Sequence, residues 1–293
     1  MNYHLRSFKT RSYWAYAFLS VDSLKTFVAV VAGIWTFVDI FDVFNVIVKN
    51  EFSIWLLVPL ILIGIIAVIV TRPPVNKITY KSSSPDVQIE VKIADLLNVP
   101  GQKVISTNTT FDTDISNGII SINSLQGQFT RKYYDSNISA LDREIDRQLI
   151  TYKYKHKTVQ KNGGKLERYD FGSTIKLKLA DEYFYWFAMA DMNENNTASA
   201  KLRNVEYALE KLWKFVATKG EKLDTVIPVV GAGLARLSTS KKKLITVIAQ
   251  SFITASEDQI FAEKLTIVIH PADVDKWKIN LFEVKDLLRQ YLP

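Results

Sequence analysis

A long uncharged apolar stretch limits what this chain can fold into. Residues 52–71 read FSIWLLVPLILIGIIAVIVT and hold no Asp, Glu, Lys or Arg over 20 positions. A helix rises about 1.5 Å per residue, so this length spans a bilayer's hydrocarbon core, which is about 30 Å thick. Pro59 and Gly64 are tolerated in membrane helices when neighbouring groups satisfy the backbone. The stretch therefore predicts a transmembrane helix, because a buried core helix rarely runs this long.

A second apolar segment, residues 26–48, is also long enough to span, but it carries Asp39 and Asp42. An acidic residue near the bilayer centre costs about 2.5–3.5 kcal/mol. Their spacing of three puts both carboxylates on one face of a helix. Two interpretations stay open: the pair lies shallow near the headgroups, or it faces another subunit or an aqueous path.

The charges on either side of these segments predict how they are oriented. Only Lys49, Asn50 and Glu51 separate them, which predicts a tight hairpin with both chain ends on one side of the membrane. Residues 1–83 carry eight Lys/Arg against four Asp/Glu, and Lys49 is the one basic residue in the loop. Basic flanks stay in the cytoplasm, so we expect a membrane protein with both termini cytoplasmic. A cleavable signal peptide is not expected, because about 25 mostly polar residues come first.

Composition excludes several classes of site. The sequence has no cysteine, which removes disulfides, thiolate catalysis and Cys-based metal sites. His4, His156 and His270 are too far apart to share a helix face, so no metal or cofactor is expected. The net charge of +7 comes mostly from the membrane flanks, since residues 84–293 carry 29 basic and 26 acidic side chains. Binding to nucleic acid is therefore not expected.

Residues 84–293 have the pattern of a soluble α/β domain, which follows a Pro- and Ser-rich linker ending at Pro85. Apolar and polar residues alternate or cluster as they do in strands and amphipathic helices. The predicted strands lie at residues 87–93, 104–105, 119–122, 183–189, 225–230 and 265–269, the helices at 139–149, 198–219 and 281–291, and a hairpin turns at 162–164. This alternation predicts an α/β fold.

A glycine-containing loop follows one of the predicted strands. Gly231, Ala232, Gly233 and Leu234 come after residues 225–230, and a helix is expected to open near residues 238–240. Strand, glycine loop and helix form a common phosphate-binding arrangement, because glycines let backbone amides approach an anion and the helix N-terminus adds partial positive charge. The third glycine of a dinucleotide fingerprint is missing, so a simple structural turn stays open as the alternative.

Several strings resemble a known family. They are VISTN at 104–108, SLQGQF at 124–129, YDFGST at 169–174, YWFAMADMN at 185–193 and PVVGAGL at 228–234. Together with the preceding hairpin, they resemble the divergent macro domain of membrane-bound effectors in Thoeris antiphage defence systems. The resemblance implies the fold class α/β: a two-helix transmembrane hairpin (residues 1–83), followed by a macro-domain-like three-layer α/β/α domain (residues 84–293).

The resemblance also implies a site for an ADP-ribose-like nucleotide at the carboxyl ends of the strands. Asp95 is similar to the acid that accepts from the adenine amino group, and Asn108 to the asparagine near the distal ribose. The first phosphate loop is expected at Ser124, Leu125, Gln126 and Gly127, and the second at Gly231, Ala232, Gly233 and Leu234.

The resemblance implies a sensor more than an enzyme. The first loop lacks the glycine run of hydrolytic macro domains, so no catalytic residues are expected, and the alternative is a membrane-tethered ADP-ribosyl hydrolase. A scaffold that has lost its ligand is the third interpretation. In the effectors resembled, a partner TIR-domain enzyme makes the signal from NAD, the macro domain senses it, and the membrane is disrupted in abortive infection. We also expect a homo-oligomer, since one hairpin is too small to enclose a channel.

Overall fold

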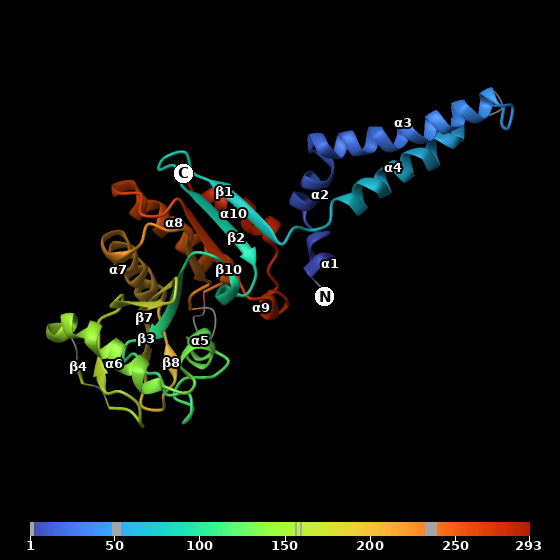
Figure 1. Ribbon diagram of the computed structural model, residues 1–293. Helices are drawn as coiled ribbons and strands as arrows, with labels where there is room; N and C mark the ends of the chain where they lie inside the picture. Colours follow the sequence, from blue (N-terminus) through green and yellow to red (C-terminus); the bar gives the residue numbers. More distant parts are fainter. Residues whose placement is uncertain (1–2, 49–53, 156, 159, 232–238) are drawn as a thin grey trace. The chain divides into compact units, whose positions relative to one another are not determined.

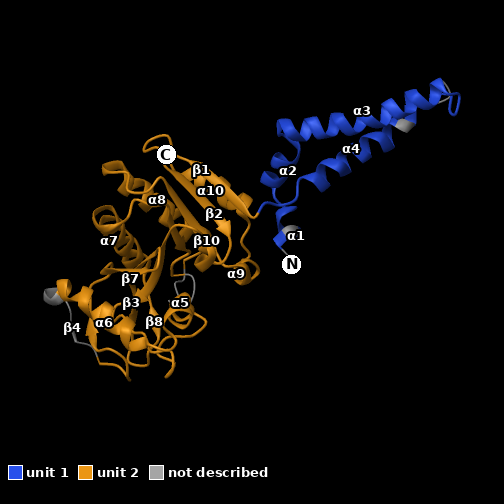
Figure 2. Cartoon of the chain, in the orientation of Figure 1, with its two compact units in different colours: residues 1–75 blue, residues 76–293 orange. Residues whose placement is uncertain are grey.

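The chain divides into two compact units, residues 1–75 and 76–293, in a computed structural model (Figures 1 and 2). The structure describes residues 3–48, 54–155, 157–158, 160–231 and 239–293. Each unit is described by itself below.

The first unit is helical. It consists of α1 (Tyr3–Ser7), α2 (Arg11–Phe18), α3 (Val21–Val43), the short 3₁₀ helix η2 (Ile54–Leu56) and α4 (Leu57–Thr71). Helices α3 and α4 run side by side (Figure 1). Gly64 of α4 allows this approach, because a Cβ there would lie 2.6 Å from the ring of Phe27 on α3.

Helix α3 begins and ends five residues earlier than the predicted span of 26–48. Ser20 caps its N-terminus by accepting from the Ser23 amide at 3.1 Å, and Asp22 in the first turn complements the helix dipole. Asn45 ends the helix, since it has a φ of 53° and a left-handed residue after the last turn is a common stop. The helix therefore differs from the predicted span at both ends, because apolarity alone does not show which residues cap a helix.

Only α3, of the helices in the described ranges, is long and apolar enough to cross a membrane. Helix α4 has 15 residues and is apolar but shorter. The predicted loop between the spans, Lys49 to Glu51, lies outside the described residues. Asp39 and Asp42 fall in the last five residues of α3, away from its middle.

The second unit is built on a mixed sheet with strand order β1-β2-β10-β9-β3-β7-β6, and β8 pairs with β7. Strands β2, β10, β9, β3 and β7 are parallel, while β1, β6 and β8 are antiparallel to their neighbours. The bounds are β1 Lys77–Lys81, β2 Gln88–Ile93, β3 Gln102–Asn108, β6 Thr174–Leu179, β7 Glu182–Met192, β8 Ala198–Ser199, β9 Thr225–Pro228 and β10 Lys264–Ile269. A small separate hairpin pairs β4 (Lys157–Thr158) with β5 (Glu167–Arg168).

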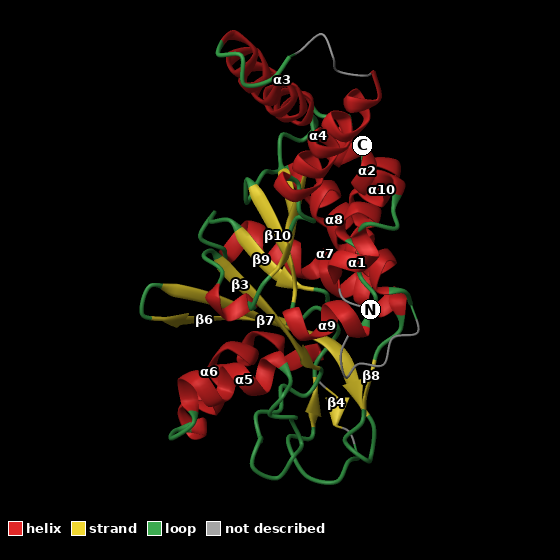
Figure 3. Cartoon of the chain, turned by 90° about the vertical axis from the view of Figure 1, so that its right-hand side faces the viewer, coloured by secondary structure: helices red, strands yellow, loops and turns green. Residues whose placement is uncertain are grey.

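Helices cover both faces of this sheet (Figure 3). On one face lie α5 (Leu125–Tyr134) and α6 (Ile138–Leu149), and on the other α7 (Leu202–Lys219), α8 (Lys241–Asp258) and α10 (Leu281–Tyr291). The short helices are η3 (Leu96–Asn98), η4 (Ile150–Lys155) and α9 (Pro271–Lys276). The unit therefore has three layers, α/β/α.

Strand β7 shows why the sequence folds in this way. Its residues 184–190 are all buried, because a strand with helices on both faces has no solvent side. Phe184 and Trp186 point to the α5 and α6 face, where they pack on Phe129. Tyr185 points the other way and meets Phe215 of α7 edge-on at 6.3 Å. This aromatic strand holds the two helical layers together.

Two further differences from the sequence prediction concern local structure. Strand β1 occupies part of the stretch that the sequence indicated as a linker, and Ile78 is buried against the sheet. The strand predicted at 119–122 is absent, since these residues form turns. There Ile120 is buried and its amide bonds to the Asp114 carbonyl at 2.9 Å, so its apolarity reflects packing and not strand pairing.

Candidate functional site

The predicted site residues follow strands that end at one edge of the sheet. Strands β2, β3 and β9 are parallel members of one sheet, so their carboxyl ends share an edge. Asp95 follows β2, Asn108 ends β3, and Gly231 follows β9. Loops at this edge form the ligand crevice of open α/β sheets. The topology thus brings Gly231 to the same edge as Asp95 and Asn108, although Gly231 lies 123 residues after Asn108 in the chain.

Asp95 caps the short helix η3. Its carboxylate accepts from the Leu97 amide at 3.0 Å and from the Asn98 side-chain amide at 3.0 Å. The residue is half-buried at the strand end. The cap holds the carboxylate in place, but it also means that any substitution at Asp95 changes local structure as well as charge.

Asn108 is buried within a polar network of the loop that follows β3. Its Oδ1 accepts from the amides of Thr110 and Asp112 and from the Thr110 hydroxyl, each at 3.1 Å. Its Nδ2 donates to Asp112 Oδ2 at 2.9 Å. An amide oxygen has two lone pairs, so the acceptor capacity of this side chain is filled by its own loop. Asn108 therefore acts on the candidate site by fixing the backbone of residues 110–112 at this edge of the sheet.

The first expected phosphate loop is the N-terminal turn of helix α5. Ser124 caps the helix by accepting from the Gly127 amide at 3.0 Å, and Leu125 is the first helical residue. Gln126 is buried and donates to the Asp112 carbonyl at 2.5 Å. Gly127 has no room for a side chain, because a Cβ would collide with the Ser121 carbonyl. These four residues supply a helix N-terminus and a packed turn in place of an open glycine loop.

The second expected loop is only partly described. Gly231 is buried with a φ of 71°, a conformation that glycine adopts without strain. Ala232, Gly233 and Leu234 lie outside the described residues. Helix α8 begins after Ser240, which caps it through the Lys243 amide at 3.3 Å. Strand β9 and helix α8 therefore follow in the predicted order, on either side of residues 232–238.

Sequence reasoning missed a buried ion pair at this edge. The Lys161 ammonium contacts the Asp112 carboxylate, and both side chains are at most 1% exposed. Lys161 also donates to the Thr110 hydroxyl at 3.1 Å, and Asp112 Oδ1 accepts from the Lys165 amide at 2.7 Å. The pair fastens the hairpin around residues 157–168 to the loop after β3. Nothing in the sequence signals a pairing of two residues 49 positions apart.

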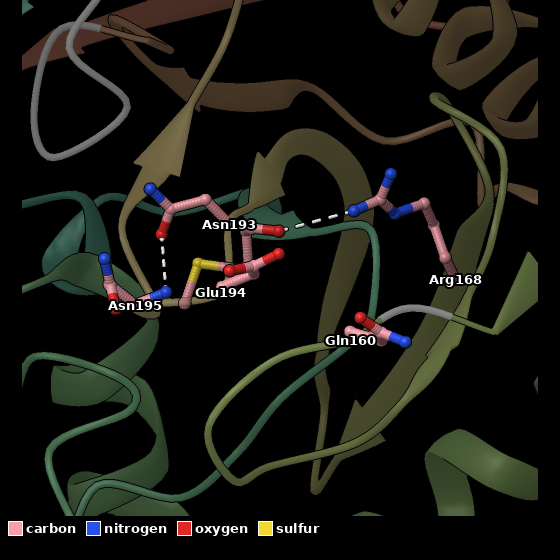
Figure 4. Close-up of a pocket in the computed structure, with 6 residues that line it drawn as sticks. Gln160, Arg168, Asn193, Glu194 and Asn195 are labelled. Carbon is pink, nitrogen blue, oxygen red and sulfur yellow. Dashed lines mark hydrogen bonds between the residues drawn. The ribbon is translucent and has the colours of Figure 1, made fainter.

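A polar cavity of about 500 Å³ opens beside this network, at the carboxyl end of β7 (Figure 4). The Arg168 guanidinium donates to the Met192 carbonyl at 3.3 Å, and its Nε lies 3.6 Å from Asp191 Oδ1. Asp191 also accepts from Thr109 of the β3 loop at 2.8 Å. The lining residues are Gln160, Arg168, Met192, Asn193, Glu194 and Asn195. In the sequence, the Asn-rich turn at residues 193–196, directly after an apolar strand, is the signal that could have indicated this cavity.

Tyr169 stands next to this cavity wall and stays neutral. Burial and a hydrogen bond to Glu167 raise the pKa of Tyr169 to about 12. Its ring meets Phe111 edge-on at 5.9 Å. In the described parts of the chain, no three His, Asp or Glu side chains are grouped to hold a metal ion.

Comparison with known proteins identifies the family. Residues 89–270 match the family described as Thoeris protein ThsA, macro domain. The chain belongs to the Thoeris ThsA macro domain family. The match covers more than half of the chain and includes β2, β3, β7, β9 and β10. The predicted family and the macro-domain-like α/β fold class are thereby confirmed.

Individual proteins are also similar to this chain. The chain is 29% identical over 243 residues to Thoeris protein ThsA of Bacillus amyloliquefaciens (strain Y2), which is 79% of either chain. Two solved structures of the Oceanobacillus iheyensis macrodomain are also similar. The structure with MES bound aligns with 73% of this chain, and the structure with ADP aligns with 74%. Each of the two is aligned over 98% of its own length, with a TM-score of 0.48 and 12% sequence identity.

Proposed function

We propose that this chain is a membrane-anchored effector of an antiphage defence system that senses an ADP-ribose-derived nucleotide. The observation that carries the proposal is the edge where Asp95, the loop of Asn108 and Gly231 follow parallel strands in a ThsA macro domain. A partner TIR-domain enzyme would make the nucleotide from NAD. Binding would then switch the chain to disrupt the membrane and cause abortive infection.

The polar network at β3 favours sensing over hydrolysis. Hydrolysis of an ADP-ribosyl bond needs a group that positions a water molecule near the distal ribose. The Asn108 amide oxygen is filled by Thr110 and Asp112, and the Asp112 carboxylate is paired with Lys161. Both groups are therefore committed to holding the loop. We propose a binding protein without turnover, and an assay that releases ADP-ribose from modified substrates would contradict it.

Helix lengths support the membrane part of the proposal. The 23 residues of α3 correspond to about 34 Å, and the 15 of α4 with the three of η2 to about 28 Å, close to a hydrocarbon core of about 30 Å. We propose that both cross the bacterial inner membrane as a hairpin with both termini and the macro unit in the cytoplasm. Residues 76–293, and not 84–293, would then form the sensing unit.

Calorimetric titration of the full chain in detergent with ADP-ribose tests the sensing function. We expect binding, and we expect Asp95→Ala to weaken ADP-ribose about tenfold or more while changing ribose 5-phosphate little, because the carboxylate accepts from the adenine amino group. Asn98→Ala is the matched control, since it removes the side chain that donates to Asp95 but keeps the carboxylate. Equal losses for both ligands would contradict the adenine role, and absent binding of ADP-ribose would contradict the function.

A second prediction concerns Asp39 and Asp42. We propose that ligand shifts the chain toward a self-associated state, in which these carboxylates of neighbouring chains share polar surroundings. The combined Asp39→Leu and Asp42→Leu variant should keep insertion and ADP-ribose affinity but leak less dye from liposomes on addition of ligand. The Asp86→Leu variant, which removes an exposed carboxylate of the second unit, is the control for altered charge. If the double variant leaks as much dye as wild type, Asp39 and Asp42 lie near the headgroups and do not contribute to leakage.

A further inference from the structure

We propose that residues 3–20, here called the collar, bind the headgroup region of an anionic bilayer at the level where α4 ends. This inference rests on the proposed membrane insertion of α3. The first 20 residues include six aromatic residues and three Lys or Arg, but no Asp or Glu. Aromatic rings and basic side chains are enriched where a protein crosses from hydrocarbon to water. The collar comprises α1 and α2.

One side of the collar is fastened to the segment that leaves α4. The Tyr13 side chain is fully buried, and its hydroxyl donates to the Arg72 carbonyl at 3.1 Å. Tyr3 reaches the Val75 carbonyl at 2.5 Å. The Arg72 guanidinium lies 5.9 Å from the Tyr16 ring and 3.4 Å from Asp22 at the start of α3. These contacts fix the collar at the start of one apolar helix and the end of the other.

The other side of the collar is apolar and exposed. Trp14 and Phe18 stack at 5.7 Å, with Trp14 40% exposed. The Trp14 indole N–H donates to the Phe8 carbonyl at 2.8 Å, which satisfies its polar edge. Leu19 is 83% exposed, and the exposed apolar surface continues into α3 at Val21. A surface continuous with a membrane helix favours lipid as its occupant over a protein partner.

Charge selects the kind of lipid. Lys9 and Arg11 are exposed beside the aromatic side chains, and Lys25 is exposed one turn into α3. Each basic residue near an anionic surface favours the bound state about fivefold. The collar therefore fits a bilayer rich in acidic headgroups, and it would hold the residues Arg72 to Val75 near that surface.

Because the chain has no cysteine, single labelled positions can test this inference in the full protein. Leu19→Cys carries an environment-sensitive fluorophore in vesicles of phosphatidylcholine mixed with phosphatidylglycerol. Phe37→Cys, 63% exposed on α3, reports insertion, and Leu223→Cys, 44% exposed in the second unit, reports water. We expect brominated lipid to quench the labels at 19 and 37, and aqueous iodide to quench the label at 223.

In anionic vesicles, the combined Lys9→Gln and Arg11→Gln variant should shift the equilibrium of the label at residue 19 between bilayer and water about 25-fold toward water. Lys214→Gln with Lys219→Gln, two exposed lysines of α7, should leave it unchanged. If iodide quenches residue 19 as strongly as residue 223 while lipid still quenches residue 37, the collar faces water and this inference is overturned alone. If lipid fails to quench residue 37, the membrane span and the collar are both overturned. If lipid quenches the label at residue 19 equally in neutral and anionic vesicles, and equally in the Lys9→Gln and Arg11→Gln variant, the preference for anionic lipid is overturned.

Discussion

Gly231→Val is expected to lower the affinity of the chain for ADP-ribose at least about 100-fold, which is about 2.7 kcal/mol. Gly231 is buried three residues after the end of β9 and has a φ of 71°. This conformation is disfavoured for a β-branched residue, so we expect the backbone to shift to relieve the strain and to carry the following amides away from a bound phosphate. Calorimetric titration with ADP-ribose measures the loss. Gly233→Val is expected to act in the same way, by placing a branched side chain where backbone meets phosphate.

The control separates lost binding from lost stability. Gly101→Ala introduces strain at the opposite edge of the sheet, where φ is 121° and a Cβ would lie 2.5 Å from the Asp224 carbonyl. This variant should lower the Tm but leave the Kd for ADP-ribose unchanged. Gly231→Val should remain folded, because a left-handed non-glycine residue costs about 1–2 kcal/mol and a domain is stable by about 5–15 kcal/mol. A wild-type Kd in Gly231→Val would remove the second-loop assignment.

The long periodic segments could be predicted from the sequence. The helix α7 was indicated by apolar residues at helical spacing, and Gly220 ends it as expected. The apolar runs of β7 and β10 predicted buried strands in an α/β sheet. These patterns are strong because burial on one or both faces requires them throughout the element. The order of strands in the sheet was not predictable from such local signals.

Short elements escaped prediction because their local signals are ambiguous. Strand β1 reads KITYK between Pro- and Ser-rich stretches, and only its pairing with β2 makes it a strand. The resemblance places the first phosphate loop at Ser124 to Gly127, and in the structure this segment is the N-cap and first turn of α5. The apolar residues 119–122 suggested a strand, although they pack as turns. For β1 and for residues 119–122, tertiary contacts decided between alternatives that the local sequence leaves equal.

The candidate site was predictable by position more than by role. Asp95 is named from its place after the first strand of the domain, Asn108 and Gly231 are named from short strings, and the topology brings their strands to one edge. The hydrogen bonds of Asn108 to Thr110 and Asp112 could not be foreseen, since they depend on how the loop closes. The Arg168 cavity forms only when Gln160 and Arg168, which precede β6 in the chain, meet residues 192–195 at the end of β7. Such groupings arise only from the folded chain.

Lys161→Met is expected to lower the free energy of unfolding by about 3–5 kcal/mol. The Lys161 ammonium and the Asp112 carboxylate form an ion pair in which both side chains are at most 1% exposed. Methionine keeps much of the apolar stem but leaves a buried carboxylate without its cation, and desolvation of that charge is no longer offset. Urea denaturation of the full chain in detergent, followed by fluorescence, measures the change.

Lys165→Met, in the same hairpin, is the matched control. Its ammonium lies 2.9 Å from Asp142 and 3.1 Å from Asp146, but its side chain is 26% exposed and the Asp146 side chain 64%. Exposed pairs contribute about 0–1 kcal/mol, so this variant should lose little stability. Hydrogen exchange should also accelerate at residues 160–168 in Lys161→Met alone, because that pair fastens the hairpin to the loop after β3. Equal losses in the two variants would show that the buried pair does not hold this edge of the site together.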